Sequence, residues 1–225
     1  MESIKLIWVL AEKDLRIEFR TRQAFLSTLF FALLVLIVFQ FAFDPGSRAT
    51  QQAAPGILWV ALLFPGIIQL NRSFQSEMEE GTLYGIILSP ISHGTFFLGK
   101  FLANWSFLIA IDLLILVLFI VSFNFPLKLT LLWIVLLIFL ASAGFAAVGT
   151  LFAAMVSSVA TREVLLPILL FPILIPLILA AVNGTQEVLL REEFRFLSQW
   201  IKMLAAFDVI FLAASFLVID HVVGD

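Results

Sequence analysis

The chain has 225 residues, of which 62% are hydrophobic and only 13% are charged. Globular domains are about 45–50% apolar and about 25% charged, so this composition excludes an ordinary soluble domain and indicates a polytopic membrane protein. The net charge of −3 argues against nucleic-acid binding, and the absence of cysteine excludes disulfides, thiolate metal sites and thiol redox chemistry.

Residues 1–22 are predicted to form an amphipathic helix at the membrane–water interface. Apolar residues recur at spacings of three and four, at Ile4, Trp8, Ala11, Leu15 and Phe19. Charged residues occupy the remainder of the helix, at Lys5, Glu12, Lys13, Arg16 and Arg20. A solvated helix before the first span is the alternative, but a Trp among basic residues favours the interface. No short apolar core with a cleavage site follows, so we expect no cleavable signal peptide.

Six apolar runs are long enough to cross, or nearly cross, a hydrocarbon core of about 30 Å as helices. They predict an all-α integral membrane protein that forms a single polytopic domain over residues 1–225. The predicted spans are residues 25–43, 53–70, 96–123, 129–156, 164–182 and 201–219. Small residues concentrated at positions 141–149 predict close helix–helix packing by the fourth span.

Two spans contain helix breakers. The second carries Pro-Gly pairs at residues 55–56 and 65–66, which a membrane tolerates where neighbouring protein satisfies the freed backbone groups. We therefore expect this span to be buried in the bundle or kinked at an interface. The fifth contains three prolines and is predicted to be a kinked helix or a pair of half-helices. Residues 183–199, which follow it, interleave charged and apolar side chains and predict a short amphipathic helix on the membrane surface.

A polar stretch, residues 71–100, separates the second and third spans. Because the rest of the chain suits a bilayer, this stretch is where we expect a soluble partner to bind, and residues 71–95 are predicted to be the coupling loop. A hydrated interfacial loop, whose acids merely remain in water, is the alternative. The acids in question are Glu77, Glu79 and Glu80.

The spacing within this loop predicts two short helices. Phe74 and Met78 lie four residues apart, so one helix would present them together. Gly81 suits the position that follows a helix C-terminus, and Thr82 is a suitable N-cap for a second helix that Pro90 ends. Two such helices would make a compact element able to enter a cleft on a partner.

Basic residues set the predicted orientation. Eight of the 13 lysines and arginines lie in the N-terminal segment or in the loops on the same face of the membrane. Since positive charge favours the cytoplasmic side, both termini and the coupling loop are predicted to be cytoplasmic.

The sequence GTFFLGK at residues 94–100 matches the pattern of a phosphate-binding loop by chance. Phe101 replaces the Ser or Thr that would bind magnesium, and no strand precedes the motif. We therefore expect no ATP hydrolysis by this chain.

Three charged residues, Lys100, Asp112 and Asp208, are predicted to lie within the membrane. Charges at such depth are costly and usually face the bundle interior. Lys100 is predicted to snorkel to the cytoplasmic interface, on the same helix face as Asn104. Asp112 and Asp208 are expected at similar depth, because their spans run in opposite directions. They either line a polar path or lock helix packing through a buried carboxylate.

Three segments resemble the CcmB family, the B subunit of the cytochrome c maturation haem exporter, within the wider class of type-2 ABC export permeases. They are APGILWV (residues 54–60), LNRSFQSEMEEGTLYGIILSP (residues 70–90) and GKFLANW (residues 99–105). The most specific residues of the resemblance, besides the Pro-Gly pair, are Arg72, Phe74, Glu77, Gly81, Leu83, Pro90 and Lys100.

The resemblance implies a non-catalytic permease subunit in the bacterial cytoplasmic (inner) membrane, with ATP used by a separate ABC ATPase subunit. The ATPase-coupling element would consist of loop residues Arg72, Phe74, Glu77, Glu79, Glu80, Gly81, Leu83 and Pro90. Further implied partners are haem-handling membrane subunits, a haem chaperone and a second permease copy, with membrane lipid around them. Haem would be the transported or handled ligand, and the coupled step either haem export or release of the loaded chaperone.

In this setting His93 and His221 invite interpretation as haem ligands. Both lie near span ends and far apart in sequence, so interfacial, non-ligating histidines are favoured. No catalytic, cofactor-binding or metal-binding residue is therefore expected.

Three other functions were weighed. A secondary transporter with its own midplane site would use the broken spans two and five, but it needs no acidic cytoplasmic loop. An intramembrane enzyme would need a motif such as HExxH or GxSxG, and the sequence has neither. A type-2 ABC export permease with a different substrate stays open.

Overall fold

The protein is a bundle of long helices in the computed structural model, which describes residues 2–21, 23–43, 47–79, 91–126, 129–157, 159, 161–191 and 194–223. The helices are α1 (Glu2–Thr21), α2 (Gln23–Ala42), α3 (Arg48–Glu79), α5 (His93–Ser122), α6 (Leu131–Val156), α7 (Arg162–Gln186), the π-helical turn η1 (Glu187–Arg191) and α8 (Phe194–Val223). The predicted all-α fold is confirmed.

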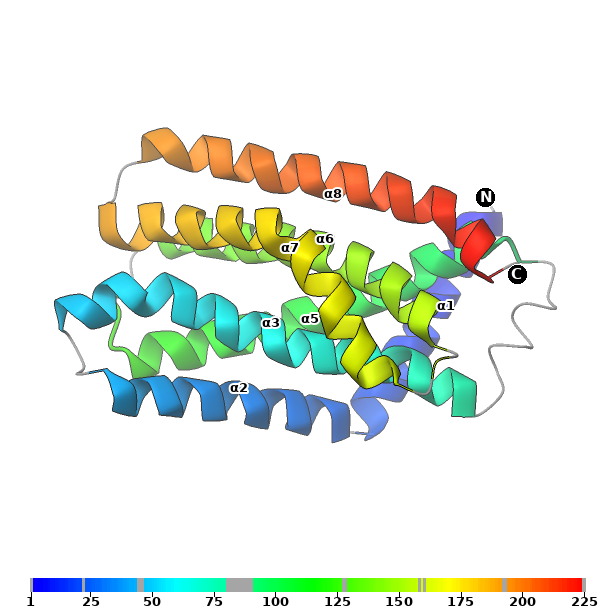
Figure 1. Cartoon of the computed structure of the whole chain (residues 1–225), viewed down its shortest axis with the longest axis horizontal. Coiled ribbons are helices and arrows are strands. Elements are labelled where there is room, and N and C mark those ends of the chain that lie inside the picture. Colours follow the sequence, from blue (N-terminus) through cyan, green and yellow to red (C-terminus); the bar gives the residue numbers. More distant parts are fainter. Residues whose placement is uncertain are drawn as a thin grey trace.

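Among the described residues, six helices are long and apolar enough to cross a membrane, as predicted. The spans run lengthwise through the molecule, and α1 crosses them steeply near one end (Figure 1). This is the orientation expected of an interfacial helix beside transmembrane helices. The membrane-compatible segments are Phe25–Ala42, Arg48–Phe74, His93–Ser122, Leu131–Val156, Arg162–Leu190 and Phe196–Asp220.

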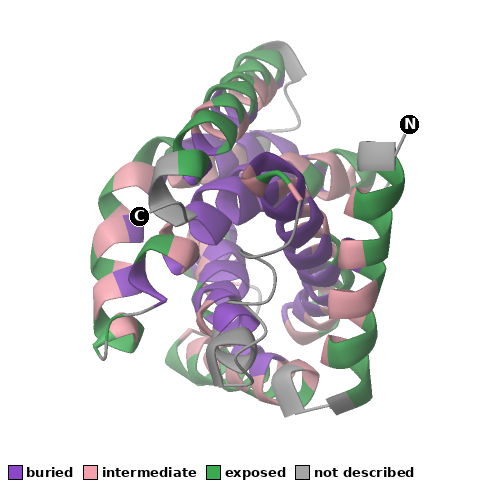
Figure 2. Cartoon of the chain, turned by 90° about the vertical axis from the view of Figure 1, so that its right-hand side faces the viewer, coloured by how far each residue is buried: buried purple, intermediate pink, exposed green. Residues whose placement is uncertain are grey.

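The second span, α3, is the most buried of the six. The structure buries 72% of its most apolar window, against 22% for α2 and 28% for α8. Viewed from the end of the bundle, buried residues gather on inward helix faces while the outer faces are exposed (Figure 2). The burial of α3 confirms the expectation drawn from its Pro-Gly pairs, since neighbouring helices surround it on several sides.

Glycines let the helices approach closely at the centre of the bundle. A Cβ atom at Gly149 of α6 would lie 2.2 Å from Leu70 Cδ1, and one at Gly66 of α3 would lie 2.7 Å from the Phe145 ring. These contacts between α3 and α6 confirm the close packing predicted for the small residues of the fourth span.

The fifth span is one continuous helix. Pro167, Pro172 and Pro176 all lie inside α7, which bends near its middle (Figure 1). Of the two alternatives, the kinked helix is therefore correct.

The predicted surface helix over residues 183–199 is wrong. The chain continues from α7 through η1, and α8 begins at Phe194. The apolar side chains of Val188 and Leu197 are buried, with exposures of 3% and 2%, and a Cβ at Gly184 would lie 3.0 Å from Leu137. Packing against the bundle therefore outweighs the local alternation of charged and apolar residues.

The connection between the helices of spans two and three is shorter than predicted. Helix α3 continues through Glu79 and α5 begins at His93, so residues 73–79 belong to a long helix and form no separate one. The turn at Gly81 and the second short helix lie outside the described residues. So do Glu80, Leu83 and Pro90.

The end of the bundle at which α3 ends and α5 begins also receives the end of α8 and is crossed by α1. His93 Nδ1 lies 3.4 Å from Asp220 Oδ1, which places the start of α5 beside the end of α8. We call this the loop end. The end of α3, the start of α5 and the end of α8 therefore share one end of the bundle.

Candidate functional site

The loop end begins with a capped helix. Ser92 has an extended backbone, and its hydroxyl oxygen accepts a hydrogen bond from the Thr95 backbone N–H at 3.3 Å. An N-cap of this kind satisfies a free donor of the first turn. The sequence Ser-His-Gly-Thr after Pro90 is a signal that would have placed the start of α5 correctly.

Lys100 lies further along α5 and is a buried cation whose charge is balanced by nearby oxygen atoms. Its side chain is 3% exposed, and its Nζ lies 3.0 Å from Asp14 Oδ2 of α1. The same Nζ donates a hydrogen bond to the Ser73 carbonyl of α3 at 3.0 Å and lies 5.1 Å from the centre of the Phe74 ring. Lys100 therefore joins α1, α3 and α5.

The two acids of α1 that face this site, Asp14 and Glu18, were missed by sequence reasoning. They lie four residues apart and so share a helix face with Ala11, which is 2% exposed. Leu10 adjoins that face, since a Cβ at Gly99 of α5 would lie 2.7 Å from Leu10 Cβ. Of the predicted apolar face, Ala11 packs inward, whereas Trp8 and Ile4 are 65% and 64% exposed. Two acids four residues apart, on the helix face that also carries Ala11, were the available signal.

Glu18 makes the second contact between α1 and α3. Gln69 Nε2 donates a hydrogen bond to Glu18 Oε1 at 2.7 Å. Burial raises the pKa of the Glu18 carboxyl above its ordinary value, while the hydrogen bond from Gln69 and the charge of Lys100 oppose that rise. The protonation of Glu18 is therefore linked to the packing of α1.

Asn104 extends the polar contacts to a fourth helix. It lies one turn after Lys100 on the same face of α5, is 3% exposed, and donates from Nδ2 to Thr150 Oγ1 of α6 at 3.0 Å. We define the loop-end cluster as Asp14, Glu18, Gln69, Lys100 and Asn104. Its hydrogen bonds and ion pair tie α1, α3, α5 and α6 together where the coupling loop leaves the bundle.

Phe74 was predicted to belong to the docking element, but its side chain is buried within this chain. It is 3% exposed, and its ring packs edge-on against Phe96 with the ring centres 6.5 Å apart. Arg72, two residues before it, is half-buried beside a pocket described below. Glu77 and Glu79 lie in the last turns of α3.

Asp112 and Asp208 are both buried, at 5% and 7% exposure, but they lie at different depths. Counted from the His93–Asp220 contact, Asp112 is 19 residues along α5 and Asp208 is 12 residues back along α8. At about 1.5 Å per residue these distances are about 28 Å and about 18 Å, so the two carboxylates do not share one level. Oδ1 of Asp208 makes no hydrogen bond and faces Gly144, where a Cβ would lie 2.5 Å away.

The side chain of His93, raised above as a candidate haem ligand, contacts an acidic residue. Its ring is 29% exposed and lies beside Asp220, which is 64% exposed. The side chain of His221 is not among those the structure describes.

Six apolar spans and buried polar contacts between their helices define a multi-pass helical membrane protein. Comparison with known families places it more narrowly. Residues 5–223 match the family described as "CcmB protein", and the chain belongs to that family.

Relatives named "Heme exporter protein B" are similar to the chain over different lengths. The protein of Escherichia coli K12 is 30% identical over 100 residues, which are 44% of this chain and 46% of that protein, so the match spans under half of its length. The Pseudomonas aeruginosa protein is 27% identical over 80% of this chain and 81% of its own. The Rhodobacter capsulatus protein is 29% identical over 74% and 76%.

Proposed function

We propose that this chain is the membrane subunit of an ABC exporter that serves c-type cytochrome biogenesis in the bacterial inner membrane. The observation that carries the proposal is the family match over residues 5–223, together with relatives named for haem export. The chain hydrolyses no ATP in this account, because its only GxxxxGK sequence lies at the start of a membrane-spanning helix. A separate ATPase subunit supplies the energy.

The ATPase binds the coupling loop, residues 71–95, in the cytoplasm. Both termini lie on the same side. The support for this step is geometric: the two helices that flank the loop, α3 and α5, are joined at its base by the Lys100 hydrogen bond to Ser73. A force applied to the loop is therefore delivered to both helices at once.

The loop-end cluster then distributes that force to the rest of the bundle. Asp14 and Glu18 couple α3 and α5 to the interfacial helix α1, and Asn104 couples α5 to α6. Because these contacts join the four helices directly, displacement at the loop moves the helices together. Phe74 acts inside this joint, and the docking contacts come from Arg72, Glu77, Glu79, Glu80, Gly81, Leu83 and Pro90.

The transported or handled ligand is haem, and the coupled step is haem export or the release of a haem-loaded chaperone. Partners in this account are a second permease copy, haem-handling membrane subunits and the chaperone. Asp112 and Asp208 serve packing or a polar path, and neither role requires haem ligation.

Charge reversal in the loop tests the coupling role. The variant E77K/E79K/E80K should insert normally but lose co-purification of the ATPase subunit, because three acids of the coupling loop become cations. A matched control, E2K/E12K/D220K, makes the same change in charge on α1 and α8 and should retain the ATPase. Unchanged co-purification and unchanged ATPase activity in the loop variant would refute the docking role.

A further inference from the structure

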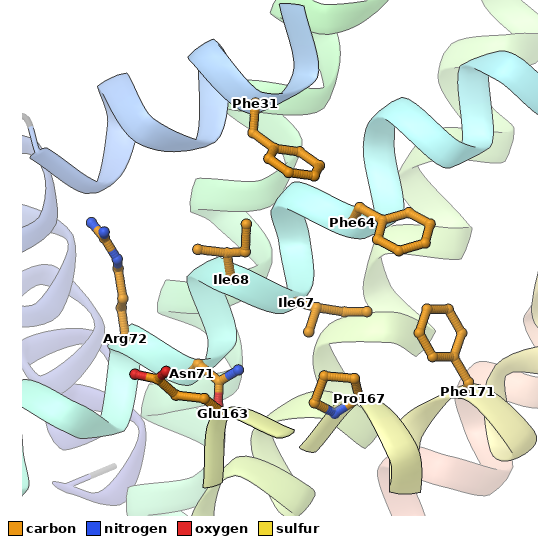
Figure 3. A pocket seen from close by; sticks show the side chains of 9 residues that line it. All are labelled: Phe31, Phe64, Ile67, Ile68, Asn71, Arg72, Glu163, Pro167 and Phe171. Carbon is orange, nitrogen blue, oxygen red and sulfur yellow. The ribbon is translucent and has the colours of Figure 1, made fainter. Parts of the chain in front are cut away.

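A pocket of about 550 Å³ opens between α2, α3 and α7 near the loop end (Figure 3). Its volume is within the range of about 300–1,000 Å³ that is common for ligand sites. The polar residues that line it are Asn71, Arg72 and Glu163, and Phe31, Phe64 and Phe171 are among the apolar ones. The loop-end cluster does not line it, so this pocket is distinct from the candidate site above.

The lining is polar at one level and apolar at another. Arg72 lies eight residues beyond Phe64 along α3, and Glu163 lies eight residues before Phe171 along α7. In both helices this spacing corresponds to about 12 Å, which is less than one leaflet of a hydrocarbon core of about 30 Å. Phe64 and Phe171 contact each other with ring centres 5.6 Å apart and form the deep end of the pocket.

The polar end holds a cation and an anion that do not neutralise each other. No ion pair joins Arg72 to Glu163 or to any other side chain among the described residues, and Arg72 extends away from the Glu163 carboxylate (Figure 3). Asn71 lies at the same level, and its Oδ1 is buried without a hydrogen-bond partner. A ligand for this end would therefore carry an anion for Arg72 and a hydrogen-bond-donating cation for Glu163 and Asn71.

We propose that this pocket binds one zwitterionic glycerophospholipid with an ethanolamine headgroup, from the leaflet at the loop end. The phosphate accepts hydrogen bonds from Arg72, the ammonium group donates to Glu163 and Asn71, and an acyl chain lies along Phe31 and Phe64 towards Phe171. Phe64 is 41% exposed, so the deep end is open to the surrounding membrane. A lipid with a choline headgroup lacks the ammonium donors, and one with a glycerol headgroup lacks the cation.

Lipid binding at this site requires no partner subunit, but the site shares Arg72 with the residues proposed to dock the ATPase. It would survive if the ligand of the exporter were not haem. A lipid held here would also contact α7 on the loop-side half of its bend, so lipid composition would affect the position of that helix (Figure 1).

Native mass spectrometry of the purified full chain in detergent tests the proposal, with phosphatidylethanolamine, phosphatidylcholine and phosphatidylglycerol of identical acyl chains as probes. We expect one phosphatidylethanolamine per chain, retained at least about tenfold better than the other two lipids, because phosphatidylglycerol loses the charge pair with Glu163 and phosphatidylcholine loses the hydrogen bonds to it. Equal retention of the three lipids would overturn the proposal. A dimer that retains none of the three lipids, because a second copy of the chain fills the pocket, would also overturn it.

Two variants separate the headgroup contacts. E163Q should lose the preference for phosphatidylethanolamine over phosphatidylglycerol. R72Q should weaken the binding of all three lipids. The control E12Q, an exposed carboxylate on α1, should change neither. Unchanged lipid preference in both pocket variants would contradict the assignment.

A measurement on the unaltered protein covers the case in which a variant fails to fold. The melting temperature of the wild-type chain should rise on addition of phosphatidylethanolamine and stay constant with phosphatidylcholine, because a ligand that binds only the folded state stabilises it. Equal shifts with both lipids would again overturn the proposal.

Discussion

Lys100 and Asp208 are both buried ionisable residues of the bundle, yet their surroundings are opposite. Lys100 has a carboxylate and a carbonyl oxygen, each 3.0 Å away, whereas Oδ1 of Asp208 makes no hydrogen bond and faces a glycine. A buried charge is costly unless it is paired and hydrogen-bonded. The comparison indicates that Lys100 works as a charged joint between helices, and that Asp208 works through its shape and polarity.

Asp14→Asn should have the largest effect on stability. The substitution removes the Asp14 carboxylate from a buried ion pair, which typically costs about 3–5 kcal/mol. Thermal unfolding in detergent should therefore show a large fall in the melting temperature.

The double variant D14L/K100M serves as the control for that result. It replaces both charges with apolar groups and should recover most of the loss, since a buried ion pair is often replaceable by well-packed apolar residues. A single Asp14→Asn variant as stable as the wild type would contradict the claim that the Lys100–Asp14 ion pair holds these helices together.

Gly144→Ala should have the next largest effect. A Cβ here would lie 2.5 Å from Asp208 Oδ1 and 2.6 Å from Leu177 Cδ1, so we expect overpacking to destabilise the protein by about 1–3 kcal/mol. Gly56→Ala is the matched control, because no atom lies within 4 Å of a Cβ at that position and Ala favours a helix by about 0.5–1 kcal/mol. Equal destabilisation by the two variants would show that close approach at Gly144 is unimportant.

Glu18→Gln should change how stability depends on pH. Since burial raises the pKa of Glu18, its protonated form stabilises the fold fully below the unfolded pKa of about 4.3, and this contribution is lost as the pH rises through the folded pKa. The Gln side chain stays neutral and can still accept from Gln69, so the variant should gain on the wild type as the pH rises. Melting curves from pH 4 to 8, with E12Q as the exposed control, check the sign. Parallel curves for wild type and E18Q would refute it.

Asp208→Asn should have the smallest effect, within about 1 kcal/mol, because Asn keeps the shape of the side chain without its charge. Equal melting temperatures with unchanged transport would support a packing role for Asp208. Equal melting temperatures with a loss of transport would instead favour a polar path. A fall in melting temperature as large as that of the Asp14→Asn variant would contradict the proposed difference between Lys100 and Asp208.

Apolar runs and helix breakers predicted the six spans, the burial of α3 and the bend in α7, because these features depend on local composition. The extension of α3 to Glu79 was missed, since it depends on Phe74 packing against Phe96, 22 positions away. Likewise, the partner of Lys100 lies 86 positions earlier in the chain, and no spacing rule connects such residues. Local amphipathicity misled at residues 183–199 because tertiary contacts bury the apolar side chains there.

Site-specific cross-linking tests the central claim most directly, and the natural absence of cysteine makes single-cysteine variants straightforward. Leu83→Cys in the coupling loop should cross-link to the ATPase subunit of the assembled complex through a short thiol-reactive linker. Leu129→Cys, an exposed position at the opposite end of the bundle, should not. A complex that assembles normally but cross-links at residue 129 and not at residue 83 would contradict the account.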